Sequence, residues 1–288
     1  MSSNPTKSNP KLTSFSYGEQ YQLEQVDKHR NRKTNHWKER IELAHTLVDK
    51  YVLNRISGKE NSEITVLDVG CSIGTMAIEM ASRGFTTYGV DFDESALKIA
   101  EGLSEEENVH VQYFKGDVAA WNPEINNLID LAVCFDIFEH LHDDELGALL
   151  QSVKKKMQEN GALIFYTFPQ QYDYLMYGRT LYALPLMLFV PFSNKVFERV
   201  VRAYASFLDV FTLLFTGKSY KEKIKKYSHC NPTTTKRLKD ILERSGFTVA
   251  QIDTFNIYPF KPLIQKIFRS KSFAHRSIYG VAYPSPNR

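Results

Sequence analysis

The stretch ITVLDVGCSIGTMAIEMASR, residues 64–83, passes from an apolar run through a glycine turn into a helix-like segment. Its apolar part ends at Asp68 and Gly70, and a turn of small residues leads to Gly74. Glycine lets a backbone approach a ligand closely, and the first turn of a helix offers free N–H groups. The stretch therefore predicts a buried parallel strand, a nucleotide-binding turn and a helix.

The runs that follow share one property, which is an acidic side chain at the end of an apolar segment. Asp91 ends residues 86–91, Asp117 follows residues 109–114, and Asp136 and Glu139 follow residues 129–135. Because parallel strands open their ligand crevice at their carboxyl ends, we expect these acids to line one site. An acidic side chain at the end of the second strand typically accepts hydrogen bonds from both ribose hydroxyls of a nucleoside.

Strands and helices alternate regularly along the chain, which predicts an α/β fold with helices on both faces of a mostly parallel sheet. We expect strands near 64–69, 86–91, 109–114, 129–135, 162–167, Phe247–Phe255 and Ser277–Tyr283, and helices near 75–83, 94–103, 143–158 and Thr233–Ser245. The pair Asn160-Gly161 is the expected stop signal of the helix that begins near residue 143.

Taken together, these motifs resemble the class I S-adenosylmethionine (SAM) methyltransferases, nearest to the ubiquinone-biosynthesis-type O-methyltransferases. The resemblance covers roughly residues 60–170 and 229–283 and rests on LDVGCSIG (67–74), VD (90–91), GD (116–117), FDIFEH (135–140), ALIFYTFP (162–169) and SGF (245–247). It implies a Rossmann-like, seven-stranded sheet whose last strand is antiparallel. The family commonly has G-x-G-x-G in the first turn, whereas Ser72 takes the middle position here.

The resemblance also implies SAM as the cofactor and assigns its contacts. Gly70, Ser72 and Gly74 would form the turn under the methionine part, with Asp68 near its amino group. Asp91 would hold the ribose hydroxyls. The remaining contacts would be Phe92 beside the adenine, Asp117 and the Val118 N–H at the adenine edge, and Phe135 beside the transferred methyl group.

The segment after the fourth strand carries the candidate catalytic residues. An oxygen acceptor must lose a proton, which requires a base or a metal. In a helical turn, Asp136, Glu139 and His140 share one face, and in the resembling family this arrangement looks like a site for Mg²⁺, Mn²⁺ or Zn²⁺. His229 is a candidate fourth member. There are two alternatives to a metal site. In the first, His140, with Glu139 and His229, has an acid–base or substrate-orienting role. In the second, these residues have a purely structural role.

The chain divides into five predicted segments: a disordered polar tail (1–16), an N-terminal helical cap (17–56), the SAM-binding core (57–169), an apolar and aromatic insert (170–228), and the C-terminal part of the core (229–288). The tail has no apolar signal core, so no export is expected. The cap carries basic residues around Trp37, which are interpreted either as a solvated helix or as a substrate cap. They are His29, Arg30, Arg32, Lys33, His36 and Lys38.

The insert contains two apolar pieces, neither of which suits a transmembrane span. Leu181–Phe192 is short and interrupted by two prolines, and Val196–Phe215 has one wide apolar face interrupted by charges. The lysine-rich run KSYKEKIKKY follows at 218–227. The insert is either a lid over the substrate pocket or a peripheral membrane contact through 181–226, and both suit a lipid-like acceptor.

The sequence thus predicts a SAM-dependent methyltransferase that acts on a small or lipid-like acceptor, at oxygen. A formal net charge of +3 does not by itself imply nucleic acid. Two alternatives stay open: an RNA methyltransferase with a metal site, and a non-catalytic, membrane-peripheral protein of the same fold. The three cysteines have no metal or redox spacing, which favours reduced thiols in the cytoplasm. They are Cys71, Cys134 and Cys230.

Overall fold

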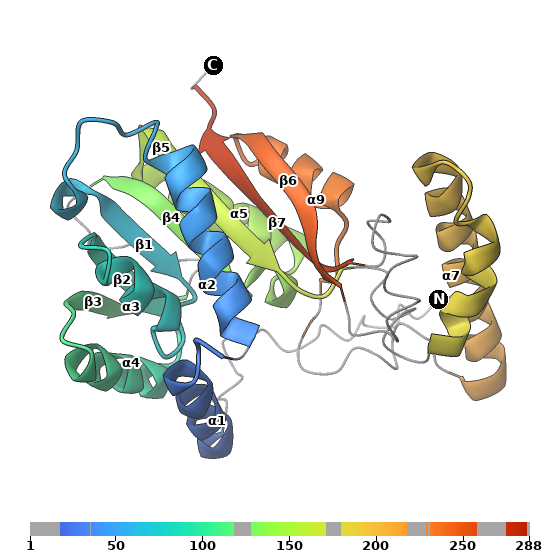
Figure 1. Ribbon diagram of the computed structural model, residues 1–288, viewed down its shortest axis with the longest axis horizontal. Helices are drawn as coiled ribbons and strands as arrows, with labels where there is room; N and C mark the ends of the chain where they lie inside the picture. The colour runs from blue at the N-terminus through green and yellow to red at the C-terminus, as the bar shows by residue number, and fades with distance from the viewer. Residues whose placement is uncertain are drawn as a thin grey trace, which may run out of the picture.

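The computed structural model describes residues 18–34, 36–117, 128–170, 180–217, 229, 231–257 and 275–286. A seven-stranded sheet in the order β3-β2-β1-β4-β5-β7-β6 forms its centre (Figure 1). The strands are β1 (Thr65–Val69), β2 (Thr86–Asp91), β3 (Val111–Lys115), β4 (Ile129–Phe135), β5 (Met157–Thr167), β6 (Phe247–Ile257) and β7 (His275–Pro284). β1 to β5 pair in parallel, and β7 pairs antiparallel with both β5 and β6.

Helices cover both faces of this sheet (Figure 1). The helical elements of the described residues are α1 (Glu19–Arg30), α2 (His36–Leu47), the π-helical turn η2 (Val48–Val52), the 3-10 turn η3 (Asn61–Glu63), α3 (Thr75–Ala81), α4 (Glu94–Glu106), the 3-10 turn η4 (Phe138–His140), α5 (Asp143–Lys156), the 3-10 segment η5 (Thr180–Phe189), α7 (Asn194–Thr216) and α9 (Thr235–Arg244). The seven-stranded α/β fold expected from the sequence is therefore confirmed.

The core is split into two apolar layers by the central strands. β1 and β4 are buried at every position, as expected for parallel strands covered on both faces. On one face, α2, η2 and α3 pack side chains such as Leu47, Val52 and Met80 against the sheet. On the other face, α5 and α9 contribute Leu149, Leu242 and their neighbours.

One expected boundary is wrong. The helix over 143–158 ends at Lys156, and β5 already begins at Met157, so Asn160-Gly161 lies inside a strand instead of ending a helix. The pairing of β4 with β5 shifts between Ile129 and Leu131, next to this pair. A Cβ at Gly161 would lie only 3.0–3.1 Å from three carbonyl oxygens. The glycine thus allows a close approach of strands at an irregular register and does not act as a helix stop.

The turn between β1 and α3 is supported by one tyrosine of β3. A Cβ at Gly74 would clash with the Tyr113 hydroxyl, and a Cβ at Gly89 would lie 2.7 Å from the Tyr113 ring. The same hydroxyl is 2.9 Å from Ser104 Oγ of α4. Tyr113 therefore fills the space that two glycines leave open, and it connects β3 to the turn and to α4.

The insert lies to one side of the sheet. Figure 1 places α7 beyond β6 and α9, and η5 is its main partner among the described elements. The buried face of α7 includes Phe197, Val201 and Leu208. None of the helices in the described ranges has the length and apolarity needed to cross a bilayer. Cys71 and Cys134 are buried free thiols, and the 1–16 tail, the 218–227 run and Cys230 lie outside the described residues.

Candidate active site

The site begins at the turn that links β1 to α3. Gly70, Ser72 and Gly74 all have positive φ, at 71°, 49° and 81°. The Gly70 and Cys71 N–H groups donate to the Val90 carbonyl at 2.8 and 2.9 Å, which fixes the turn against the end of β2. A Cβ at Gly70 would run into the Ile137 side chain. Glycine is therefore required at the first position for both conformation and space.

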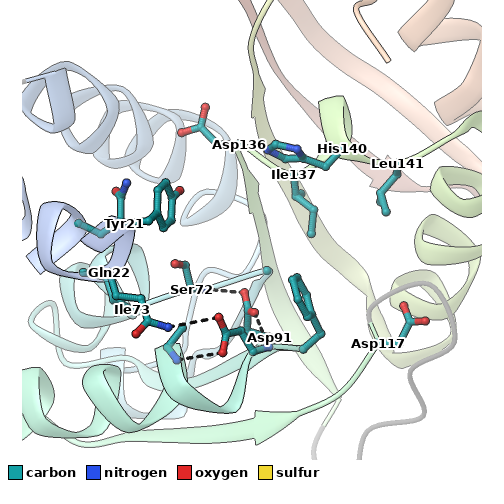
Figure 2. A pocket seen from close by; sticks show the side chains of 15 residues that line it. Tyr21, Gln22, Ser72, Ile73, Asp91, Asp117, Asp136, Ile137, His140 and Leu141 are labelled. Carbon is teal, nitrogen blue, oxygen red and sulfur yellow. Dashed lines mark hydrogen bonds between the residues drawn. The ribbon is translucent and has the colours of Figure 1, made fainter. Parts of the chain in front are cut away.

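Asp91 ends β2 beside this turn. Its carboxylate accepts the Ser72 N–H at 2.8 Å and the Asp93 N–H at 2.9 Å (Figure 2). Burial raises the pKa of Asp91, and the backbone N–H groups oppose that rise. A carboxylate oxygen can accept more than one hydrogen bond, so Asp91 keeps acceptor capacity toward the cavity that it lines. This arrangement suits the predicted contact with two ribose hydroxyls.

Asp68 is the second buried carboxylate of the turn. Burial raises its pKa to about 7, while a hydrogen bond from the Ala77 backbone opposes the rise. Its Oδ2 atom is buried without a hydrogen-bond partner among the described residues. A buried carboxylate oxygen in this state is costly unless a ligand satisfies it. The ammonium group of the methionine part of SAM has the charge and the donors to do so.

Two adjoining cavities continue from this turn. The smaller, about 130 Å³, is lined by Asp91, Phe92 and Asp117, which are the residues predicted to hold the nucleoside (Figure 2). The larger, about 800 Å³, is lined by Asp68 and Phe135. Both cavities share Gly70, Ser72, Ile73, Asp136 and His140. Of the predicted cofactor residues, Gly74 lines neither cavity and Val118 is outside the described residues, whereas the others line one cavity or both.

The larger cavity has aromatic walls and a polar end. Trp37 of α2, Phe135 of β4 and Phe168 after β5 provide the aromatic surface. Glu139, His140 and His229 lie at the polar end. Segments more than 85 residues apart in sequence, η4 and the loop before α9, meet here. The cavity therefore offers a flat apolar acceptor both a binding surface and proton-accepting groups.

Glu139 is the most buried member of this polar group, with 1% of its surface exposed. Thr167 Oγ1 donates to Glu139 Oε2 at 2.8 Å. Burial, together with the neighbouring Asp136 carboxylate, raises the pKa of Glu139 well above its usual range.

His140 and His229 form a pair whose ring centroids are 4.9 Å apart. Phe168 meets the His229 ring edge-on at 5.8 Å. Burial lowers the pKa of His229 to about 4, and the neighbouring His140 acts in the same direction. His229 is therefore neutral at physiological pH. Its unprotonated ring nitrogen can accept a hydrogen bond or a proton.

The geometry of the candidate metal group differs from the predicted set of Asp136, Glu139 and His140. Ligand atoms of Glu139, His140 and His229 lie within 4.8 Å of one another. Asp136 instead pairs with Arg40 of α2, at 2.7 Å from Nε to Oδ2. Arg40 also lines the larger cavity and was not singled out from the sequence.

The fold, the glycine turn and the acids at the ends of β1 and β2 define a class I SAM-dependent methyltransferase. The comparison with known families agrees, because the chain belongs to the methyltransferase-domain family, whose model matches residues 37–252. That match includes most of α2, the turn between β1 and α3, η4 and about half of β6.

Curated proteins that are similar to part of this chain are named as O-methyltransferases. A ubiquinone biosynthesis O-methyltransferase from Nitrosomonas europaea is 33% identical over 120 residues, which is 41% of this chain and 50% of that protein. One from Pseudomonas fluorescens is 28% identical over 140 residues, or 48% of this chain and 58% of that protein. The chain thus spans about half the length of the curated relatives that it matches.

Solved structures support the fold. A protein from Pyrococcus horikoshii aligns with a TM-score of 0.55 at 16% identity, covering 94% of this chain and 100% of that one. The magnesium protoporphyrin IX methyltransferase of Synechocystis, solved with bound S-adenosylhomocysteine (SAH), aligns with a TM-score of 0.52 at 16% identity, covering 92% and 96%.

Proposed function

We propose that this enzyme transfers the methyl group of SAM to a hydroxyl oxygen of a small, flat or lipid-like acceptor. The observation that carries the proposal is the larger cavity, which joins the cofactor turn to aromatic walls and to the paired imidazoles of His140 and His229. The curated relatives named as O-methyltransferases support oxygen as the methylated atom.

In the proposed reaction, the acceptor hydroxyl lies between the sulfonium methyl group and His140. A ring nitrogen of His140 takes the hydroxyl proton as the oxygen attacks the methyl carbon, and the carbon–sulfur bond breaks to leave neutral SAH. His229 would hold the ring of His140 in place, and Glu139 would orient the turn through its bond to Thr167. Alignment of the acceptor in the cavity supplies much of the acceleration.

A divalent cation is the second candidate for this group. One carboxylate and two imidazoles whose ligand atoms lie within 4.8 Å of one another form a donor set that suits Zn²⁺ or Mn²⁺. A bound cation would lower the pKa of an acceptor hydroxyl in place of a base. Calorimetric titration of the EDTA-treated protein with Zn²⁺ or Mn²⁺ tests this. Binding that is lost in the His229→Ala variant supports the cation, and absence of binding rejects it.

The RNA-methyltransferase alternative receives no comparable support. It relied on the basic cluster of the cap, yet His29, Arg30 and Arg32 are paired with carboxylates of the core. These pairs leave less free positive charge for a phosphate backbone.

We also propose that α7 contacts a membrane surface, from which a lipid-like acceptor would enter. Phe207, Phe211 and Leu214 of α7 are exposed, at 60%, 49% and 77%. Lys195, Arg199 and Arg202 are exposed on the same helix, and the lysine-rich run 218–227 follows it in sequence. Apolar and basic surface on one helix is typical of binding to anionic lipids.

The membrane contact is tested by co-sedimentation with phosphatidylcholine vesicles that contain or lack phosphatidylglycerol. We expect binding to the anionic vesicles only, and loss of binding when Phe211 and Leu214 are both changed to Ser. Leu23→Ser is the matched control, because Leu23 is an exposed leucine on α1. Equal binding of all variants, or self-association through α7 in light scattering without vesicle binding, would reject the contact.

The methyl-transfer proposal is tested in two steps. Calorimetry with SAH first measures cofactor binding, and a panel of phenols, quinols and lipid hydroxyls is then tested for methyl transfer from labelled SAM. Methylation at oxygen supports the proposal. SAH binding combined with methylation only of amines or carbon acceptors would reject oxygen as the target.

A further inference from the structure

The cofactor cavity has a wall that comes from outside the sheet. Tyr21, Gln22 and Gln25 of α1 line the smaller cavity together with Asp91 and Phe92 (Figure 2). Gln22 Nε2 also donates to Asp93 at 3.3 Å and contacts the Ser95 hydroxyl. A nucleoside bound to Asp91 would therefore contact α1.

α1 has little apolar surface with which to hold that position. Leu23 and Tyr21 are exposed, at 64% and 39%. Val26 packs against the small apolar group that includes Ile73 and Ile78. Because Val26 is only partly buried, its apolar contact is a weak attachment for a whole helix. Polar contacts must therefore supply much of what keeps α1 closed over the cavity.

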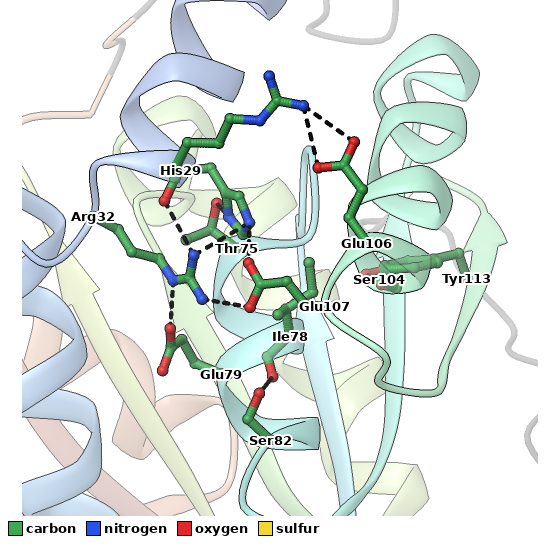
Figure 3. Close-up of polar contacts among 11 residues, drawn as sticks. His29, Arg32, Thr75, Ile78, Glu79, Ser82, Ser104, Glu106, Glu107 and Tyr113 are labelled. Atoms are coloured by element: carbon green, nitrogen blue, oxygen red, sulfur yellow. Dashed lines mark hydrogen bonds and ion pairs between the residues drawn. The ribbon is translucent and has the colours of Figure 1, made fainter.

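Those polar contacts are concentrated at the C-terminal end of α1 (Figure 3). Arg32 Nε donates to Glu79 Oε1 of α3, and its NH2 group donates to Glu107 Oε2 just after α4, both at 2.5 Å. The side chains of Arg32 and Glu79 are 12% and 15% exposed. One guanidinium thus joins the end of α1 to the two helices that flank the cofactor turn.

His29 extends the same cluster into the protein. Its Nε2 atom is 2.8 Å from Glu107 Oε1, and its Nδ1 atom is 3.1 Å from Thr75 Oγ1 at the start of α3. His29 is buried. The neutral ring satisfies both contacts, with Nε2–H donating to Glu107 and the Thr75 hydroxyl donating to Nδ1. The end of α1 is therefore tied to the helix that follows the glycine turn.

A neighbouring ion pair on α1 provides a comparison. Arg30 pairs with Glu106 at 3.1 Å, but these side chains are 60% and 55% exposed. Exposed pairs contribute little to stability because water screens them. The Arg32 pairs are shielded from water and share one planar guanidinium between two carboxylates, so they have a larger effect.

We propose that Arg32 is a positioning residue for the cofactor: by tying α1 to α3 and α4, it keeps Tyr21 and Gln22 on the nucleoside cavity and slows the release of SAH. Arg32 does not line the cavity, so it acts through α1. The same contacts make α1 a gate whose opening limits cofactor exchange.

The test is the SAH dissociation rate, measured by stopped-flow displacement with excess SAM. We expect Arg32→Ala to increase this rate about tenfold or more, in line with the loss of hydrogen bonds to charged groups. Arg32→Lys should restore part of the slow rate, since one ammonium can reach one carboxylate. Arg30→Ala is the matched control and should stay within about twofold of the wild type.

Two further variants separate gating from folding. Glu107→Gln keeps the size of the side chain and should also accelerate SAH release, which preserves the test if Arg32→Ala folds poorly. Gln22→Ala leaves the Arg32 cluster intact and removes a wall of the cavity, so it should accelerate release as well. An unchanged rate in Arg32→Ala and Glu107→Gln, or an equal acceleration in Arg30→Ala, would overturn the proposal.

Discussion

Arg40 of α2 binds both carboxylate oxygens of Asp136, at 2.7 Å from Nε and 3.2 Å from its NH2 group. Asp136 follows β4 with a φ of 55°, and the same guanidinium lies 4.7 Å from the centre of the Tyr166 ring. A cap helix therefore fixes the turn from which Glu139 and His140 extend. The polar end of the larger cavity depends on the cap as well as on the core.

Removing only the carboxylate of this ion pair should destabilise the protein more than removing both partners. Asp136→Ala removes the carboxylate that accepts two hydrogen bonds from the largely buried Arg40, so we expect a loss of about 3 kcal/mol in the free energy of unfolding. Adding Arg40→Met should recover part of that loss, because it also removes the charge that the carboxylate compensated. Urea unfolding measures both effects. Lys98→Ala, in an exposed pair with Glu94, is the control, and a loss of the same size there would contradict the explanation.

Asp91→Ala should weaken SAH binding about 100-fold, because two hydrogen bonds from ribose hydroxyls to a carboxylate are lost. Calorimetry measures the affinity. Asp253→Ala is a suitable control, since Asp253 is an exposed acid on β6, remote from the turn. Unchanged affinity in Asp91→Ala would mean that the nucleoside binds elsewhere.

Cofactor binding should depend on pH through Asp68. Because burial raises its pKa to about 7, this carboxyl is partly protonated in the free protein near neutral pH. A cationic ligand favours the ionised form, so SAH affinity should rise as the pH increases from about 6 to 8. Binding at the acid end of this range should release protons.

The proton release is measured by calorimetry in buffers of different ionisation enthalpy. The Asp68→Asn variant has no titrating group at this position, so its affinity should change much less with pH. If Asp68→Asn shows the same pH dependence as the wild type, another group is responsible, and the assigned contact with the ligand ammonium is incorrect.

His140→Ala should lower kcat by about 100-fold or more when the acceptor is a hydroxyl, because the proton acceptor is lost. The SAH affinity should change much less, because the lost ring acts on the acceptor hydroxyl in the proposed reaction. The rate of methyl transfer to the acceptor and the SAH affinity, measured on the same preparation, separate the two effects. Parallel losses in both would assign His140 a structural role.

The sequence predicted the fold well where periodicity and turn chemistry act locally. β1, β2 and β4 are short apolar runs between clear stop signals, and the structure has them at the expected positions. The start of β5 could not be predicted, because Gly161 serves a close approach to β4 that only the folded sheet reveals. The dipeptide Asn160-Gly161 could be a local helix stop or a requirement of tertiary packing, and the sequence does not distinguish the two.

Long-range polar partners were the part of the site that the sequence could not provide. Arg40 and Asp136 are 96 residues apart, and Arg32 and Glu107 are 75 apart. Nothing in the local pattern distinguishes these arginines from solvated surface residues. His229, in contrast, could be named from the resemblance, as a candidate fourth member of the group formed by Asp136, Glu139 and His140. The structure has its ring 4.9 Å from that of His140 and its ligand atom near Glu139, and its role stays a prediction.

The space shared by Tyr113, Gly74 and Gly89 constrains the order in which this enzyme can change. Alanine at residue 89 would collide with the Tyr113 ring, so it becomes tolerable only after a smaller side chain has replaced the tyrosine. Residue 74 gains no such freedom, because its φ of 81° strongly favours glycine. Any side chain at residue 89 therefore depends on an earlier change at residue 113.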